Sequence, residues 1–294
     1  MVVPTYRGGP HLREAVSSVL NQTVREVEVV VVSDGCPDDL SDLEAMDPRV
    51  RVIRQENAGV SVARNVGMAH SRGGYLAFLD EDDRAHPARI GLQLDAIRST
   101  AGAGICHGRF QVIDADGTVQ SAPQGADVQY GDMLALSFPL MSTLMVRRST
   151  AEESGGFDPT LATGEDVDFV LRSAMRTRAA FVHEVVTDYR RHGANTLTGP
   201  LDIYPVIEKH RRWALAAGRA DLVAAADLGL RRNRRNASRA AFDESRAARR
   251  RGDLVGTARS MAVSLVRDPA YVPAIAWSRI TGRPEASPEG SLPE

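Results

Sequence analysis

Four consecutive acids follow a short apolar run, and these are the residues of the chain best suited to chemistry. Residues 75–79 read Tyr-Leu-Ala-Phe-Leu, and the acids after them are Asp80, Glu81, Asp82 and Asp83. A short apolar run that contains aromatic residues is typical of a buried strand rather than a helix. Alternate side chains of an extended backbone point the same way. We therefore expect Asp80 and Asp82 to share one side and Glu81 to turn away.

The charge of this acidic cluster needs compensation, because carboxylates this close repel one another. Mg²⁺ and Mn²⁺ prefer oxygen ligands and often bridge a protein to phosphate groups, so a divalent cation is the natural partner. The alternative is a solvated acidic turn before a helix that starts near Pro87. In either case Asp83 is expected to cap that helix.

Other polar side chains stand where predicted strands end. Thr5 and Tyr6 follow the apolar residues 1–3, and Asp34 follows the β-branched run at residues 27–32. Binding groups of a parallel sheet collect at the carboxyl ends of its strands, so these residues are expected to lie near the acidic cluster. A turn-capping Asp34 and a surface-packed Tyr6 are the alternatives.

Strand-like and helix-like patterns alternate along the first two thirds of the chain. Strands are predicted at residues 1–3, 27–32, 50–53, 75–79, 104–113, 142–146 and 181–189, and helices at residues 12–20, 40–46, 61–71 and 167–177 and after Pro87. Continuous apolar strands separated by helices predict an α/β fold with a Rossmann-like, mostly parallel sheet and flanking helices. Beyond Gly199 the chain is rich in Ala and Arg and predicts helices, and its last residues predict a frayed tail.

Composition excludes several classes of protein. The 294 residues are 43% hydrophobic and 25% charged, which is ordinary for a globular protein. The net charge is -2 and the pI is about 6.4, so nucleic acid is not expected as a partner. Two cysteines are too few for a disulfide framework, which fits a reducing cytoplasm. The chain opens on an apolar strand without the features of a signal peptide, so we expect the natural start to lie a few residues earlier.

Short motifs in a fixed order resemble those of the glycosyltransferase family 2 enzymes, which have the GT-A fold. The resembling segments cover about residues 1–198 and are Val3-Pro4-Thr5-Tyr6, Val19-Leu20-Asn21-Gln22-Thr23, Val31-Val32-Ser33-Asp34-Gly35, Asn57-Ala58-Gly59-Val60-Ser61, Ala63-Arg64-Asn65, Phe78-Leu79-Asp80-Glu81-Asp82-Asp83, Gly155-Gly156-Phe157-Asp158, Gly164-Glu165-Asp166 with Leu171-Arg172, and Tyr189-Arg190-Arg191-His192. The chain departs from the family pattern at Ser33, where an acid is usual, and at Cys36-Pro37. The opening strand is also shortened.

Family membership implies transfer of a sugar from a nucleotide-sugar donor to an acceptor hydroxyl, with inversion and with Mg²⁺ or Mn²⁺. UDP is the nucleotide expected from its frequency in the family, with dTDP and GDP open. The acceptor is expected to be a sugar, a lipid-linked molecule or a small molecule, in cell-surface polysaccharide, glycolipid or natural-product glycosylation. The implied domains are a nucleotide-sugar half at residues 1–100, an acceptor half at residues 101–198, a helical region at residues 199–283 and a tail at residues 284–294.

The resemblance also implies roles for individual residues. The nucleotide sugar is expected to contact Pro4, Thr5, Tyr6, Asp34, Arg64 and Asp80. Asp82 is expected to ligate the metal directly, Asp80 to contact the ribose or a metal-bound water, and His192 to complete the metal shell or bond the diphosphate. For Arg64 the alternative is a surface ion pair, and for His192 an exposed side chain.

Asp166 is the candidate general base, with Glu165 beside it. An inverting transfer needs a carboxylate to take the proton of the acceptor hydroxyl. The alternative is that Gly164-Glu165-Asp166 only begins a helix, because acids stabilise a helix amino terminus. The two interpretations are compatible.

Three further hypotheses stay open. Ser61, Asp166 and His192 occur in the order of a serine hydrolase, although Ala63 stands where the nucleophile motif requires glycine. The chain could instead be a non-catalytic nucleotide-sugar binder or assembly partner. The basic residues 231–251 predict either a peripheral contact with anionic lipid at the inner membrane face or a solvated helical surface. A homodimer is a further open possibility.

Overall fold

The computed structural model describes residues 1–192 and 203–269 of the chain. Its internal contacts divide the chain into two compact units, Met1–Asn195 and Thr196–Glu294. The predicted tail at residues 284–294 and the last residues of the predicted acceptor half, 193–198, lie outside the described residues. The α/β class predicted for the first unit is confirmed, because strands and helices alternate through it.

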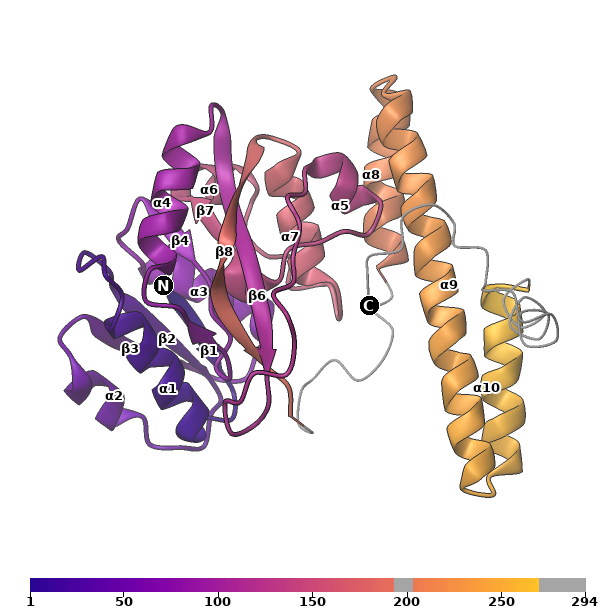
Figure 1. The fold of residues 1–294 in the computed structure, drawn as a ribbon, viewed down its shortest axis with the longest axis horizontal. Coiled ribbons are helices and arrows are strands. Elements are labelled where there is room, and N and C mark those ends of the chain that lie inside the picture. The colour runs from indigo at the N-terminus through magenta and orange to yellow at the C-terminus, as the bar shows by residue number, and fades with distance from the viewer. Residues whose placement is uncertain (193–202, 270–294) are drawn as a thin grey trace. The chain divides into compact units, whose positions relative to one another are not determined.

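A parallel sheet of three strands opens the first unit (Figure 1). Its strands are β1 (Val2–Thr5), β2 (Val29–Asp34) and β3 (Val50–Gln55), in the order β1-β2-β3. Every residue of β2 is buried, which explains its continuous run of valines. Val29 and Val31 pack in one cluster with residues of α1 (Gly9–Leu20), whereas Val30 and Val32 pack on the other face with Ala63 of α3 (Val60–His70).

A second, mixed sheet continues the first. Its strands are β4 (Tyr75–Ala77), β5 (Arg84–Ala85), β6 (Ala103–Ile113), β7 (Met145–Arg147) and β8 (Arg178–Arg190), in the order β4-β7-β6-β8-β5. Only the β6–β8 pair is parallel; β7 runs antiparallel to β4 and β6, and β5 antiparallel to β8. A parallel bridge between Val2 and Phe78 joins the two sheets. The carboxyl end of β1 therefore lies beside residues 78–83, the segment that ends in the four acids.

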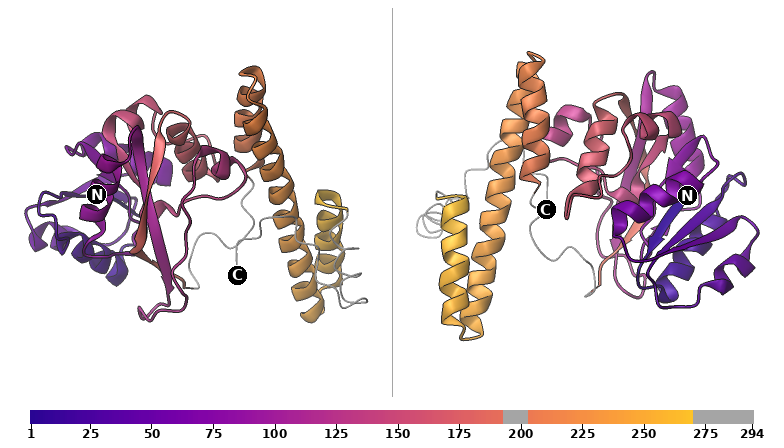
Figure 2. Two further views of the ribbon diagram at one scale, coloured as in Figure 1. Left: turned by 45° about the horizontal axis from the view of Figure 1, so that its top comes forward. Right: turned by 180° about the vertical axis from the view of Figure 1, so that it is seen from behind.

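Helices and a few short elements complete the first unit (Figure 2). The helices are α2 (Ser41–Met46), α4 (Arg89–Ser99), α5 (Tyr130–Leu134), α6 (Arg148–Glu153) and α7 (Glu165–Ala174), with a 3₁₀ turn at Met141–Thr143. The strand predicted at residues 142–146 is wrong at its start, because the 3₁₀ turn takes up residues 141–143 and β7 begins at Met145. The sequence analysis missed β5, α5 and α6, since two to six residues are too few to show a hydrophobic period.

The described part of the second unit, residues 203–269, is helical, as predicted. Its described helices are α8 (Tyr204–Ala216), α9 (Ala220–Arg250) and α10 (Leu254–Arg267). In Figures 1 and 2, α8 lies along the first half of α9, and α10 returns along its second half. The basic residues 231–251 belong to α9 apart from Arg251, which ends it. None of the described helices combines the length and the apolar character needed to cross a membrane.

Candidate active site

The four acids form a turn at the end of the acid-bearing segment. The backbone N–H of Asp83 donates to the carbonyl of Asp80 at 3.1 Å, which closes the turn. The extended backbone predicted at this point is therefore wrong: the strand β4 ends at Ala77, and the acids lie on the turn that follows. A hydrogen bond from the backbone N–H of Asp80 to Ser142 Oγ, 3.1 Å long, fixes the start of this turn.

Asp82 faces a histidine from the end of the first unit. The Asp82 Oδ2 atom lies 2.9 Å from His192 Nε2, and both side chains are mostly buried. The ring of His192 in turn packs against His11 of α1, with ring centroids 5.6 Å apart. The structure thus brings together Asp82 and His192, two of the three predicted metal ligands, across 110 positions of sequence. His11 is an addition that no sequence motif indicated.

Arg64 connects the acidic turn to the start of α7. Its guanidinium donates to Asp80 Oδ1 at 2.9 Å and to Glu165 Oε1 at 3.1 Å, and the residue is only 5% exposed. The surface ion pair considered as an alternative is wrong, because this arginine is buried. Burial lowers the pKa of Arg64, but the charges of Asp80, Glu165 and Asp166 more than offset it, so the net effect is a raised pKa. Arg64 therefore stays a cation between the two acidic groups.

A reciprocal pair of hydrogen bonds joins Asn65, the residue after Arg64, to the backbone of Phe157. Asn65 donates from Nδ2 to the carbonyl of Phe157 and accepts at Oδ1 from its N–H, both at 2.8 Å. The ring of Phe157 stacks on Phe169 of α7 at 4.2 Å and lies 5.4 Å from the Arg64 guanidinium. Gly156 has φ 72°, and a side chain there would collide with Asn65. Two segments that the sequence showed only as separate motifs are therefore one packed unit.

Asp34 anchors the loop that precedes α3. Its carboxylate is 5% exposed and accepts hydrogen bonds from Ala58 N at 2.8 Å, Gly59 N at 2.9 Å and Gln55 Nε2 at 2.8 Å. These contacts give Asp34 a structural role in the β3–α3 connection. A carboxylate offers about four acceptor positions, so a further bond to a ligand N–H or hydroxyl is compatible with them.

The loop after β1 is tied to the acidic turn through Glu81. The Glu81 carboxylate accepts hydrogen bonds from the Thr5 hydroxyl and, at 3.1 Å, from the N–H of Gly8. Thr5 is 2% exposed, whereas the neighbouring Tyr6 is 54% exposed and presents its ring to solvent. Glu81 thus links the loop after β1, which is predicted to contact the nucleotide, to the turn that contains Asp82. The sequence analysis missed this role because it only expected Glu81 to turn away from its neighbours.

Arg190, the last residue of β8, holds the acidic turn through hydrogen bonds. Its side chain donates to the carbonyls of Asp82 and Ala115, each at 2.8 Å, and its backbone N–H donates to Asp83 Oδ1 at 2.9 Å. The helix-capping role predicted for Asp83 is wrong, because α4 begins at Arg89 with Ala88 as its cap residue. Asp83 instead joins the turn to β8.

Glu165 and Asp166 are the first residues of α7, after Gly164 in the left-handed conformation. The expected helix start is therefore present. Burial, followed by the charge of Asp166, raises the pKa of Glu165, although Arg64 opposes this. Asp166 accepts a hydrogen bond from the N–H of Val167 at 2.7 Å and is partly exposed. Of the two acids, Asp166 is thus the one outside the Arg64 ion pair.

The electrostatics of the acidic turn favour a cation. Burial, followed by the charge of Asp80, raises the pKa of Asp82, and the bond to His192 only partly opposes this. Burial, followed by the charges of Asp80 and Asp82, raises the pKa of Asp83 well above its usual range. Burial and neighbouring carboxylates both disfavour the ionised form of these acids, and a bound cation would offset both effects.

The donor set fits a divalent ion that completes its shell elsewhere. In the part of the chain that the structure describes, no group of three or more His, Cys, Asp or Glu side chains is arranged to hold a metal. Mg²⁺ typically binds one or two carboxylates, several waters and the phosphates of a substrate, so a full protein cage is not needed. Asp82 with His192, and Asp80 nearby, supply ligands of that kind.

The hydrolase hypothesis gains no support from this geometry. Ser61 is 6% exposed and lies in the first turn of α3. His192, which would have to activate it, faces Asp82 instead.

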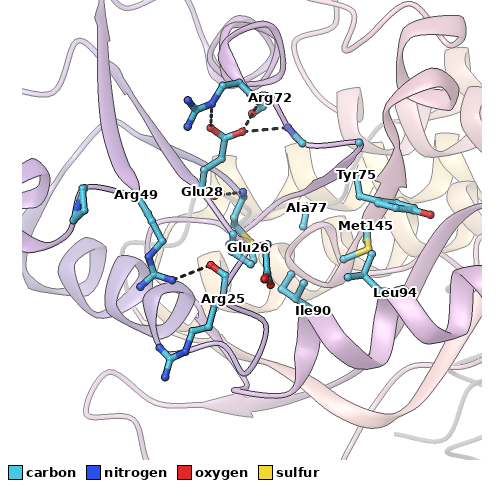
Figure 3. A pocket seen from close by; sticks show the side chains of 16 residues that line it. Arg25, Glu26, Glu28, Arg49, Arg72, Tyr75, Ala77, Ile90, Leu94 and Met145 are labelled. Atoms are coloured by element: carbon cyan, nitrogen blue, oxygen red, sulfur yellow. Dashed lines mark hydrogen bonds and ion pairs between the residues drawn. The ribbon is translucent and has the colours of Figure 1, made fainter.

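A cavity of ≈ 530 Å³ lies at the opposite ends of the strands (Figure 3). Its lining includes Met1, Glu28 and Tyr75, which precede or open β1, β2 and β4. Glu28 is bonded there to the side chain of Arg72 at 3.2 Å and to its backbone N–H at 2.5 Å. Because the acidic turn and Asp34 lie at the carboxyl ends of strands, this cavity is separate from the candidate active site.

A family comparison matches the first half of the chain. The sequence model described as "Glycosyl transferase family 2" matches residues 1–153. This segment contains β1 to β7 and the acidic turn, but it ends before α7.

Several curated proteins with similar sequences are named as glycosyltransferases. The chain is 27% identical over 205 residues to chondroitin synthase of Escherichia coli. The matched region covers 68% of this chain and 30% of that protein. It is 26% identical over 211 residues to an uncharacterised glycosyltransferase of Rickettsia prowazekii, covering 69% of this chain and 66% of that protein. The chain thus spans less than two thirds of the length of either relative.

Solved structures share the fold. The chain superposes on TarS 1-349 of S. aureus in complex with UDP with a TM-score of 0.68 and 18% identity, over 96% of this chain and 91% of that one. The same protein in complex with UDP-GlcNAc gives a TM-score of 0.60 and 16% identity, over 89% of each chain. These neighbours are GT-A glycosyltransferases, so the GT-A fold expected from the sequence is confirmed.

Proposed function

The chain belongs to glycosyltransferase family 2, whose model covers more than half of it, and we propose that it is an inverting, metal-dependent enzyme that transfers a sugar from a nucleotide-sugar donor to an acceptor hydroxyl. Membership of the family makes it a glycosyltransferase. Inversion, metal dependence and the identities of donor and acceptor are parts of the proposal.

One observation carries the proposal, namely that Arg64 bridges the acidic turn and the acids of α7. Asp80 and Glu165 are 85 positions apart, yet both bond one guanidinium. Donor-binding and proton-accepting groups must lie within one substrate length of each other for the transfer to occur. The bridge supports that arrangement. A guanidinium also matches the geometry of phosphate oxygens, so Arg64 is suited to the donor diphosphate when a ligand displaces one of its carboxylates.

The donor is proposed to lie against the carboxyl ends of β1 and β2. Pro4 and Thr5 end β1, and Tyr6 begins the loop after it, where its exposed ring offers a stacking face for a base. Asp34 offers acceptors for the base or ribose at the end of β2. UDP is the proposed nucleotide, because the structural neighbour TarS was crystallised with UDP and with UDP-GlcNAc.

Asp82 and His192 are proposed to hold Mn²⁺ or Mg²⁺, with Asp80 beside them. When bound, such an ion would neutralise the charge that develops on the departing nucleoside diphosphate. The raised pKa of Asp82, caused by burial and then by Asp80, supports this role because a cation relieves the repulsion. Because Arg64 already neutralises part of the charge of Asp80, Asp82 is proposed as the carboxylate that ligates the ion directly.

Asp166 is proposed to be the general base. It takes the proton from the acceptor hydroxyl while the oxygen bonds the anomeric carbon and the bond from that carbon to the diphosphate oxygen breaks. Glu165 is the less suitable base, since its ion pair with Arg64 holds it toward the donor side. Its proposed role is to position the guanidinium.

A pair of substitutions tests this assignment. Asp166→Asn should keep the affinity for UDP in calorimetry and lower turnover of UDP-sugar by about 10²–10⁴-fold. Asp168→Asn is the control from the same helix, two residues further along, because Asp168 pairs with Arg172. Near wild-type turnover by Asp166→Asn would move the base elsewhere in the site.

A non-catalytic nucleotide-sugar binder is the remaining alternative. Metal-dependent UDP binding without turnover of any donor would support it. The acceptor class, a cytoplasmic location, a homodimer and contact of residues 231–251 with an anionic membrane remain predictions.

A further inference from the structure

Helix α10 presents a row of apolar side chains to solvent. Leu254, Val255 and Val266 are 75%, 80% and 82% exposed, and Val263 and Leu265 are about 40% exposed. Positions 255 and 266 are three turns apart on one side of the helix, and Leu254 and Leu265 repeat that spacing beside them. These five residues are called the α10 apolar face.

The residue of α10 that is buried against α9 is polar. Ser264 is 0% exposed, and Ser238 of α9 donates to its carbonyl at 2.8 Å and lies 2.9 Å from its hydroxyl, oxygen to oxygen. A helix of a globular protein normally buries its branched apolar residues and exposes its hydroxyls. α10 does the reverse, so the contact with α9 does not account for its apolar residues.

The segment that carries the α10 apolar face has a strong excess of positive charge. Residues 231–267 contain eleven arginines and three acids. Two of the acids are engaged locally: Glu244 pairs with Arg251 at 2.7 Å, and Asp253 accepts from Gly256 N at 2.8 Å as the cap of α10. Arginines therefore outnumber acids by eight in this segment of α9 and α10.

We propose that the α10 apolar face inserts into the interface of an anionic lipid bilayer. An apolar helix face flanked by arginines is the arrangement that binds such interfaces, where the apolar side enters the acyl boundary and the cations meet lipid phosphates. A second copy of the chain would instead bring two arginine-rich surfaces together, which like charges oppose. The proposal does not depend on the sugar transfer. It names α10 as the element that enters the lipid, beside the basic residues 231–251.

Vesicle flotation of the full chain tests this proposal. Wild-type protein should float with vesicles of phosphatidylglycerol and phosphatidylcholine at least about tenfold more than with phosphatidylcholine alone, and added salt should reduce binding. The double substitution Val255→Asp with Val266→Asp should lower binding about tenfold or more. Val119→Asp is the matched control, because Val119 is a 51% exposed valine of the first unit.

A charge variant and a mass measurement separate the possible outcomes. Arg249→Gln with Arg250→Gln should weaken binding to anionic vesicles while circular dichroism and UDP affinity stay unchanged, which also guards against misfolding of the aspartate variant. Wild-type protein that fails to float would overturn the proposal. So would an aspartate variant that floats like Val119→Asp, or one whose only change is the loss of a dimer in light scattering.

Discussion

Asp188 is expected to stabilise β5, the strand that follows the acidic turn. It lies on β8, is 2% exposed, and accepts hydrogen bonds from Arg84 Nε at 2.7 Å and Gln111 Nε2 at 2.8 Å, with His86 Nε2 2.7 Å away. Arg84 is the first residue of β5 and His86 follows that strand, which comes directly after the acidic turn. We predict that Asp188→Asn destabilises the first unit and loosens the turn.

The size of this effect follows from the pKa of Asp188. Burial raises this pKa, but the hydrogen bonds from His86, Gln111 and Arg84 outweigh burial and lower it from 3.8 to about 2. A shift of that size corresponds to about 2 kcal/mol at neutral pH, since one pKa unit is about 1.4 kcal/mol. Because the folded pKa is lower than the unfolded one, this stability is present above pH 3.8 and is lost as the pH falls toward 2. By about pH 3, roughly 1 kcal/mol of it should be gone.

Urea unfolding followed by far-UV circular dichroism measures the difference. Trp213 and Trp277 both lie beyond residue 195, so tryptophan fluorescence records the second unit separately. At pH 7 Asp188→Asn should cost the first unit about 2 kcal/mol, and at pH 3 the gap to wild type should narrow by about 1 kcal/mol. The control Asp42→Asn, which breaks a surface pair with Arg13, should change stability by less than about 1 kcal/mol.

Two results would refute this reasoning. One is a destabilisation by Asp188→Asn no larger than that of Asp42→Asn. The other is a destabilisation that is the same at pH 7 and pH 3, because the stabilising contribution would then not come from the ionised carboxylate.

Three further substitutions probe the contacts of the site. Glu81→Ala should raise the KM for UDP-sugar about tenfold with little change in kcat, since a lost charge-assisted bond is worth about 1.5–3 kcal/mol; an unchanged KM would contradict its link to the nucleotide loop. Asn65→Ala should lower Tm by about 4–8 °C, because it removes both bonds to Phe157 at about 1 kcal/mol each; a shift under about 1 °C would mean that water replaces them. His192→Ala should weaken Mn²⁺ affinity in the presence of UDP about tenfold or more, and an unchanged titration would exclude it from the metal site.

The strands and longer helices were predictable because their patterns are local. The valines of β2 and the spacing of Leu12, Val16 and Val19 in α1 specify buried faces without reference to distant residues. The turn at residues 80–83 was not predictable in this way, since its shape depends on Ser142 and Arg190. A pattern that alternates along a strand gives no signal where the strand stops.

The candidate residues were predictable as a set, but their contacts were not. Asp82 and His192 meet across 110 positions, and no local pattern indicates such a pair. Glu81 and Asp34 turn out to hold loops in place, through bonds to backbone N–H groups that only the folded chain brings near. The roles of Arg190 and Asn65 likewise depend on tertiary contacts.

The central claim is that the acidic turn, through Asp82, holds a divalent ion that in turn binds the donor diphosphate. Calorimetric titration of UDP with and without Mn²⁺, on wild type and Asp82→Asn, tests it most directly. Mn²⁺ should tighten UDP binding to wild type at least about tenfold and should leave the UDP affinity of the variant unchanged. Equal UDP affinity with and without Mn²⁺ in wild type, or an intact metal effect in Asp82→Asn, would contradict it.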